Sequence, residues 1–169
     1  GALPGVPQPS QKNFETNLAT QLERVDLTRP LYVEGESARI GKLSLPLSLV
    51  ARMREAPRVI EIAATPEARL AYLLRDYTYL GDDREALAEQ LGKLKEMQGK
   101  ESVARWQQWA RAGELAPLFA ELMAQHYDPH YQRSQERHFK AWPTRERVMA
   151  EDLSDAAVAE LARRVLLLG

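Results

Sequence analysis

The sequence predicts an α/β fold with a large helical insertion. A short apolar run at 31–33, directly after Pro30, is typical of a buried strand in a parallel sheet. A helical pattern follows at 46–56, and residues 58–63 are rich in β-branched side chains. Strand, helix and strand over about 30 residues form a βαβ unit, so the two strands should be parallel.

Helices are also expected near both ends of the chain. Ser10 is a suitable N-cap for a helix that runs to Arg24. A weak pattern at 137–142 predicts a third strand. Ser154 should cap a last helix, which we expect to pack inward through four apolar side chains. These are Val158, Leu161, Ala162 and Val165.

Residues 65–126 have the pattern of a nearly all-helical block, which begins at Thr65-Pro66-Glu67. Trp106 should face its core, and Asp128-Pro129 should break its last helix. We therefore predict a single domain over residues 1–169. Its α/β core covers about 1–64 and 136–169, and its helical insertion covers about 65–135.

Composition excludes several classes of protein. With 169 residues, 44% of them hydrophobic, the chain can form one real core. No apolar run approaches the ~20 residues that span a bilayer, so we expect no membrane partner and a cytoplasmic location. Because the chain has no cysteine, it carries no disulfide, thiolate metal site or thiol chemistry. It starts with neither Met nor a signal peptide, so we expect that it begins inside a longer polypeptide or after a cleavage.

Polar side chains follow the strand predicted at 31–33. Glu34, Glu36 and Ser37 come where parallel sheets bind ligands, beyond the carboxyl ends of their strands. Carboxylates there can hold Mg²⁺ or act as a general base. The alternative is a strand followed by a solvated turn.

Two segments are locally basic although the net charge is only −1. If they meet in space, their arginines could bind phosphate groups. The alternative is that they are ordinary solvated helix faces. The first comprises Arg39, Lys42, Arg52, Arg54 and Arg58, and the second Arg133, Arg137, Lys140, Arg145 and Arg147.

The three histidines, His126, His130 and His138, lie close together in the sequence. We predict no metal site, because Pro129 should disturb the helical spacing of the first two. A structural or phosphate-contacting role is the better interpretation. The chain has no GxxxxGK[ST] loop, which argues against a complete nucleotide-binding domain and against a small-molecule kinase.

Several stretches, in this order over about residues 4–135, carry a resemblance to one family. They are Pro7-Gln8-Pro9-Ser10-Gln11 with Phe14-Glu15, Val33-Glu34-Gly35-Glu36-Ser37 with Ile40-Gly41, Leu45-Pro46, Arg52-Met53, the 67–77 helix with Arg69-Leu70, and His126-Tyr127-Asp128-Pro129-His130-Tyr131. With these, the chain resembles the bacterial tRNA 2-selenouridine synthases. It departs from them at Gly35, where the family usually has Asp, and at Ala38, where it usually has Arg.

The resemblance implies an N-terminal rhodanese domain followed by a P-loop domain, of which this chain is the C-terminal part. The expected fold is then a partial P-loop NTPase-like parallel sheet with a helical insertion. The family converts 2-thiouridine at the tRNA wobble position to 2-selenouridine through an S-geranylated intermediate. Its substrates are tRNA, geranyl diphosphate and selenophosphate. No cofactor is expected in this chain, which should be inactive without the upstream rhodanese and P-loop segment.

The resemblance also suggests site residues. Glu34, Glu36 and Ser37 are the expected catalytic residues, and no metal ligand is expected. The expected phosphate- or tRNA-binding residues are Gln8, Ser10, Gln11, Arg39, Arg69, Arg133 and Arg137. The alternative function is a non-catalytic helical module that binds RNA or protein.

Overall fold

The computed structural model describes residues 6–26 and 28–168, which group into two compact units. The first unit comprises the residues up to 59 together with 135–145, and the second comprises 60–134 and 146–168. Each is described by itself. The prediction of a single domain over 1–169 stays a prediction.

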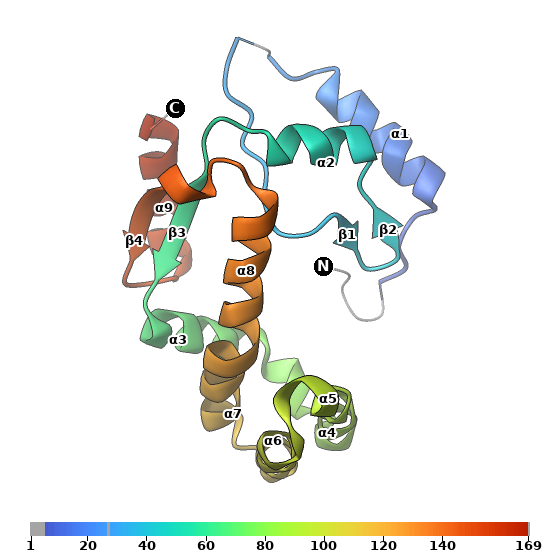
Figure 1. Cartoon of the computed structure of the whole chain (residues 1–169), viewed down its shortest axis with the longest axis vertical. Coiled ribbons are helices and arrows are strands. Elements are labelled where there is room, and N and C mark those ends of the chain that lie inside the picture. Colours follow the sequence, from blue (N-terminus) through green and yellow to red (C-terminus); the bar gives the residue numbers. More distant parts are fainter. Residues whose placement is uncertain (1–5, 27, 169) are drawn as a thin grey trace. The chain divides into compact units, whose positions relative to one another are not determined.

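The first unit joins helices to a small hairpin (Figure 1). Ser10 caps its first helix by accepting a hydrogen bond from the backbone N–H of Asn13 at 3.3 Å, as predicted. Val50 is the buried residue of its second helix. Its elements are α1 (Gln11–Leu22), the antiparallel strands β1 (Arg39–Ile40) and β2 (Leu43–Ser44), and α2 (Leu47–Arg54).

The strand predicted at 31–33 is wrong, and with it the predicted βαβ unit. Residues 31–35 have no regular structure, and Leu31, Tyr32 and Val33 are 52%, 40% and 49% exposed. A strand needs a neighbour to satisfy its backbone groups. The parallel partner of β3 (Ile60–Ala64) is instead β4 (Glu146–Ala150), with Ile62 opposite Val148.

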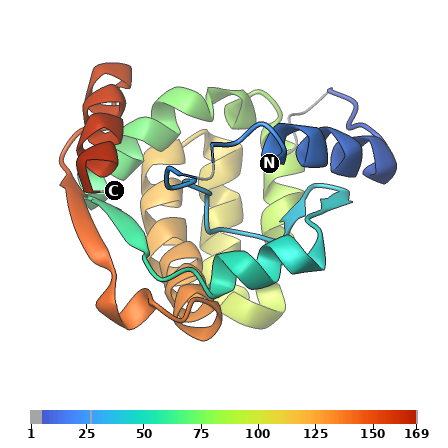
Figure 2. The same cartoon turned by 90° about the horizontal axis from the view of Figure 1, so that it is seen from above.

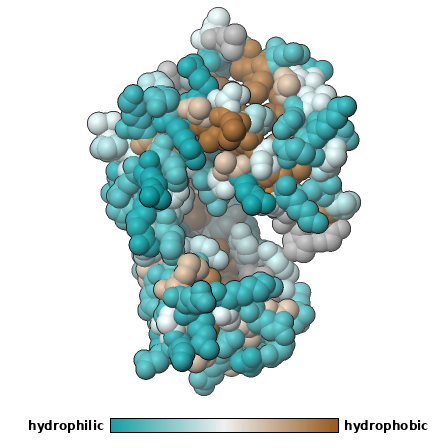
Figure 3. All heavy atoms as spheres, turned by 45° about the vertical axis from the view of Figure 1, so that its right-hand side comes forward, coloured by the Kyte–Doolittle hydropathy of each residue, from teal (hydrophilic) through white to brown (hydrophobic). Residues whose placement is uncertain are grey.

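The helical block lies between the two parallel strands of the second unit, so the α/β class with a helical insertion is confirmed. Its core contains the fully buried side chains of Trp106 and Leu118. The part of this block at the bottom of Figure 3 turns mainly hydrophilic side chains outward on the face shown. The elements are α3 (Pro66–Asp76), the 3-10 helix η1 (Thr78–Gly81), α4 (Arg84–Gly92), α5 (Lys95–Gln98), α6 (Lys100–Ala112) and α7 (Leu115–Leu122).

The predicted helix break at Asp128-Pro129 is wrong. A π-helical turn, η2 (Met123–Tyr127), connects α7 to α8 (Asp128–His138) as one continuous rod (Figure 1). Proline lacks an N–H and its ring collides with the carbonyl four residues earlier in a regular α-helix. The wider turn directly before Pro129 changes that spacing, so the helix continues.

The strand predicted at 137–142 is also wrong. Local hydrogen bonds occupy this backbone: the N–H of Phe139 donates to the Gln135 carbonyl, and the N–H of Trp142 donates to the Phe139 carbonyl. The segment therefore contains the end of α8, followed by the 3-10 turn η3 (Trp142–Thr144).

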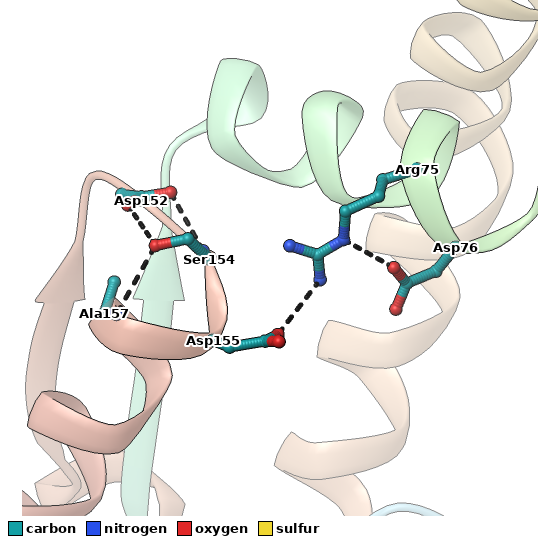
Figure 4. Close-up of polar contacts among 6 residues, drawn as sticks. All are labelled: Arg75, Asp76, Asp152, Ser154, Asp155 and Ala157. Atoms are coloured by element: carbon teal, nitrogen blue, oxygen red, sulfur yellow. Dashed lines mark hydrogen bonds and ion pairs between the residues drawn. The ribbon is translucent and has the colours of Figure 1, made fainter.

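The last helix, α9 (Asp155–Leu168), lies beside β4 (Figure 2). Its predicted cap is confirmed: Ser154 Oγ accepts from the N–H of Ala157 at 3.4 Å (Figure 4). Leu161 is buried as predicted, whereas Val158 and Ala162 are exposed. The prediction that Val158 and Ala162 pack inward is wrong, because a two-stranded sheet covers only a narrow stripe of the helix.

Arg75 connects α3 to the start of α9. Its guanidinium lies 2.6 Å from Asp76 and 3.9 Å from Asp155 (Figure 4).

Within the described residues, no helix is long and apolar enough to cross a membrane.

Candidate functional site

The turn that carries Glu34, Glu36 and Ser37 belongs to the first unit. Its carboxylates are exposed, and Ser37 Oγ accepts a hydrogen bond from the backbone N–H of Arg39 at 3.1 Å. This local bond shapes the turn and leaves the two carboxylates facing solvent. The structure therefore brings the three predicted catalytic residues together in one turn.

Gln135 holds this turn in place. Its side chain is only 2% exposed, and its Nε2 donates to the backbone carbonyl of Gly35 at 2.8 Å. The Gly35 Cα also packs under the Phe139 ring, since a Cβ there would lie 3.1 Å from Phe139 Cζ. No sequence pattern indicates this role, because a glutamine within a polar helix normally faces water.

A cavity of about 30 Å³ lies behind the turn. Glu36 and Ser37 line it together with Arg54, His138 and apolar side chains. A cavity of this size admits water but not a diphosphate group. A substrate would therefore have to approach the carboxylates from the exposed side of the turn.

Gln8, Ser10 and Gln11 serve the fold of the first unit. Gln8 Nε2 donates to the Ile40 carbonyl at 2.7 Å, and its Oε1 accepts from the N–H of Lys42 at 2.8 Å. Gln11 forms the same pair of bonds with the backbone of Ser44, at 2.7 and 3.0 Å. Both amides thus extend the β-hairpin edge, while Ser10 caps α1.

The two basic segments meet at one point in the first unit. The backbone N–H of Lys140 donates to the Arg54 carbonyl at 3.1 Å, and Lys140 Nζ lies 3.2 Å from Glu55. Arg39 is exposed, and so is Arg137. Other members of the second segment have partners: Arg145 stacks over Trp142 at 4.2 Å, and Arg147 pairs with Glu61 at 2.9 Å.

Arg69 and Arg133 lie in the second unit. Arg69 forms a bidentate ion pair with Asp128, with Nη1 2.8 Å from Oδ2. The hydrogen-bonded Asp128 carboxylate raises the pKa of Arg69. Arg133 Nε donates to the Pro129 carbonyl at 2.9 Å. Both guanidinium groups therefore support the helix that contains the π-turn.

The continuous helix brings two of the histidines together. The rings of His126 and His130 are 4.9 Å apart, edge to face, and Gln98 Nε2 lies 3.1 Å from His126 Nδ1. Desolvation, and then the proximity of His130, lower the pKa of His126. Among the described residues, no group of three potential ligands could hold a metal ion.

An apolar cavity of about 680 Å³ opens in the second unit. Its described lining includes leucines of α3, α4 and α7, Leu94 before α5, Phe119 of α7 and Met123 of η2. The sequence indicates that these residues are apolar and helical, but the packing of the helices determines that a space remains between them. Among the residues that the structure describes, the lining comprises Arg69, Leu73, Tyr77, Tyr79, Asp83, Ala86, Leu87, Gln90, Leu91, Leu94, Phe119, Leu122, Met123, His126 and Tyr127.

A short parallel sheet, a helical insertion and a polar turn define a mixed α/β protein of the P-loop-like class. The sequence pattern described as "tRNA 2-selenouridine synthase AAA domain" matches residues 2–104. The chain therefore belongs to the tRNA 2-selenouridine synthase AAA domain family. No solved structure gave a match.

Curated relatives carry the name tRNA 2-selenouridine synthase. The one from Bordetella petrii is 30% identical over 160 residues, which cover 78% of this chain and 42% of the relative. The one from Chromohalobacter salexigens is 32% identical over 148 residues, which cover 73% of this chain and 40% of the relative. The one from Marinobacter nauticus is 41% identical over 74 residues, which cover 43% of this chain and 20% of the relative. The chain thus spans less than half the length of these relatives.

Proposed function

We propose that this chain is part of a cytoplasmic tRNA-modifying enzyme that replaces sulfur by selenium in 2-thiouridine at the tRNA wobble position. The family match over residues 2–104 carries this proposal. Geranyl diphosphate would supply the group for an S-geranylated intermediate, and selenophosphate would donate selenium. The chain alone is expected to be inactive, because it has neither a cysteine nor a GxxxxGK[ST] loop.

The turn with Glu34, Glu36 and Ser37 is the proposed catalytic element. In the first step, the thiocarbonyl sulfur would bond to the geranyl carbon that carries oxygen, and the C–O bond would break to release diphosphate. Negative charge grows on the leaving group during this step, so groups that bind the diphosphate lower the barrier. The two carboxylates would position it, directly or through a cation, and Arg39 would neutralise part of its charge.

Two exposed basic residues of the first unit, Arg137 and Lys140, would bind tRNA phosphates. Arg137 and Lys140 belong to the basic part of the first unit, where Lys140 contacts the end of α2. Single phosphate contacts add affinity without sequence preference and weaken with salt. Gln8, Ser10 and Gln11 support the hairpin through the bonds described above, so any effect of their substitution on tRNA binding would be indirect.

Turnover by the full-length enzyme tests the proposal. We expect Glu36→Ala to lower selenation of a 2-thiouridine-containing tRNA at least 100-fold without changing the thermal unfolding midpoint, because Glu36 is exposed. Glu23→Ala, which removes an exposed carboxylate at the end of α1, is the matched control and should keep normal turnover. Near-normal activity of Glu36→Ala would refute the assignment of the turn.

A further inference from the structure

The proposed catalytic turn belongs to neither a helix nor a strand. Glu34 and Glu36 are exposed on either side of the half-buried Gly35. The bond from the Arg39 N–H to Ser37 Oγ is local and fixes only the end of the turn. Backbone without ladder bonds is held by the side chains that contact it, so the placement of the two carboxylates depends on what binds Gly35.

Two residues at the end of α8 contact Gly35. Gln135 Nε2 donates to the Gly35 carbonyl at 2.8 Å, across 100 positions of the sequence. The ring of Phe139 lies where a side chain on Gly35 would point. The Phe139 N–H donates to the Gln135 carbonyl at 3.0 Å, so the helical spacing extends to Phe139 and both side chains lie on one face. Both residues and the turn belong to the first unit.

The glycine at position 35 is needed for space and not for backbone conformation. Its φ lies outside the left-handed region, unlike those of Gly41, Gly99 and Gly113. A Cβ on Gly35 would lie 3.1 Å from Phe139 Cζ, closer than an ordinary carbon–carbon contact. The close approach of the Phe139 ring is therefore what requires a glycine here.

The amide of Gln135 fixes the orientation of the Gly35 peptide group. Its side chain is only 2% exposed, and a hydrogen bond in such surroundings is stronger than one in water. Without this donor, the Gly35 carbonyl would have to turn toward water to find a partner. That rotation would move Glu34 and Glu36, which flank the peptide group. A displacement of about 1 Å in a catalytic group can lower the rate about 100-fold.

We propose that Gln135 and Phe139 are positioning residues for catalysis: acting through Gly35, they hold the two carboxylates of the turn in the geometry that the reaction needs. This inference rests on the proposed function of the turn. It adds that the activity of Glu34 and Glu36 depends on buried contacts with Gln135 and Phe139, and not only on the charge of the turn.

Turnover and amide hydrogen exchange of the full-length enzyme test the inference. Gln135→Met keeps the approximate size of the side chain and removes the donor. We expect kcat to fall about 10–100-fold and KM for the tRNA to stay within about twofold, because the substitution moves catalytic groups and removes no phosphate contact. The segment 34–39 should exchange faster than in the wild type, because the turn loses its buried bond.

Gln107→Met is the matched control in the second unit. Gln107 Nε2 donates to the Ala88 carbonyl at 2.9 Å, so this variant also removes a glutamine donor from a backbone carbonyl. It should lower the thermal unfolding midpoint by a similar few degrees, and it should keep a normal kcat and normal exchange of 34–39. The two variants therefore separate positioning of the turn from loss of stability.

A second set of variants tests the ring contact without changing Gln135. Gly35→Ala should lower kcat about tenfold, because the new Cβ displaces the ring or the turn. Phe139→Leu has no atom at the position of Cζ and should lower kcat less. The double variant should be more active than Gly35→Ala and Phe139→Leu alone, because the alanine methyl group fills the space that Cζ leaves.

The inference is overturned if Gln135→Met keeps a normal kcat, if it loses kcat without faster exchange of the turn, or if Gln107→Met loses as much. Additive effects of Gly35→Ala and Phe139→Leu would also overturn it. Its failure can be distinguished from failure of the proposed function. If Glu36→Ala abolishes turnover while Gln135→Met keeps it, only the positioning role fails. If Glu36→Ala keeps normal turnover, the catalytic assignment of the turn fails, and the positioning role fails with it.

Discussion

Glu121 accepts the hydrogen bond of the most buried aromatic side chain of the second unit, that of Trp106. Trp106 is fully buried, and its indole N–H donates to Glu121 Oε2 at 3.0 Å. Arg105 binds the same carboxylate through its Nε, also at 3.0 Å. Arg105, and to a smaller extent Trp106, lower the pKa of Glu121, while desolvation opposes them. The ionised form of this carboxylate is therefore the form that stabilises these contacts more.

We predict that Glu121→Ala lowers the free energy of unfolding by about 1–3 kcal/mol, because it leaves the indole N–H of Trp106 without an acceptor. Glu121→Gln keeps a neutral acceptor and should lose less. Urea denaturation measures both. The pKa of Glu121 is lower in the folded state, so its contribution is complete above the ordinary value of 4.5 and is lost as the pH falls through the folded value.

The difference between the wild type and Glu121→Gln should therefore shrink on acidification below pH 4.5. A difference that stays constant down to the acid transition would show that the charge of Glu121 is not what stabilises Trp106.

The ends of helices illustrate how the elements depend on one another. Helix α6 ends at Gly113, whose φ of +79° lies in the left-handed region. Arg84, from the start of α4, reaches the last carbonyls of α6, those of Arg111 and Ala112, at 3.5 and 3.4 Å. A Cβ on Gly113 would lie 2.8 Å from the Arg84 guanidinium carbon. The glycine therefore allows both the left-handed cap and the arginine contact.

We predict that Gly113→Ala lowers the free energy of unfolding by about 1–2 kcal/mol, the cost of a left-handed conformation for a residue with a Cβ. Gly92→Ala is the matched control within α4. There alanine favours the helix by up to about 1 kcal/mol, and only the Gln107 side-chain amide, 3.2 Å from the new Cβ, has to move. Thermal unfolding should give opposite signs for the two variants. Equal losses would contradict the role of the positive φ.

At the scale of the whole molecule, the two units differ in how much they bury. Helix α6 buries Val103, Trp106 and Ala110, whereas no residue of α1 is buried. Regions with few buried apolar contacts open locally at low free energy, and regions in a packed core open only on global unfolding.

Amide hydrogen exchange should reflect this difference. We predict that α4, α6 and α7 exchange slowest, because they share the main apolar core, and that α1 exchanges fastest among the helices of the described segments. Exchange followed by peptide mass spectrometry measures both. Equal protection of α1 and α6 would contradict the prediction.

Local sequence patterns are enough to predict most helices and their caps. Ser10, Thr65 and Ser154 accept the expected backbone bonds, and Trp106 lies in the core, because these patterns act over a few residues. The sequence predicts Glu34, Glu36 and Ser37 beyond the end of a strand at 31–33, which the structure does not have; their catalytic role stays a prediction.

Tertiary contacts determine which strands pair, where the helix continues through Pro129 and where a cavity remains between helices. The partner of β3 is β4, which begins at Glu146, 82 residues after β3 ends at Ala64. No local pattern at 31–33 could indicate this pairing. The roles of Gln135 and of the apolar cavity arise from contacts between distant segments. Such contacts depend on the packing of the whole chain, whereas caps and helical faces depend on neighbours within a turn or two.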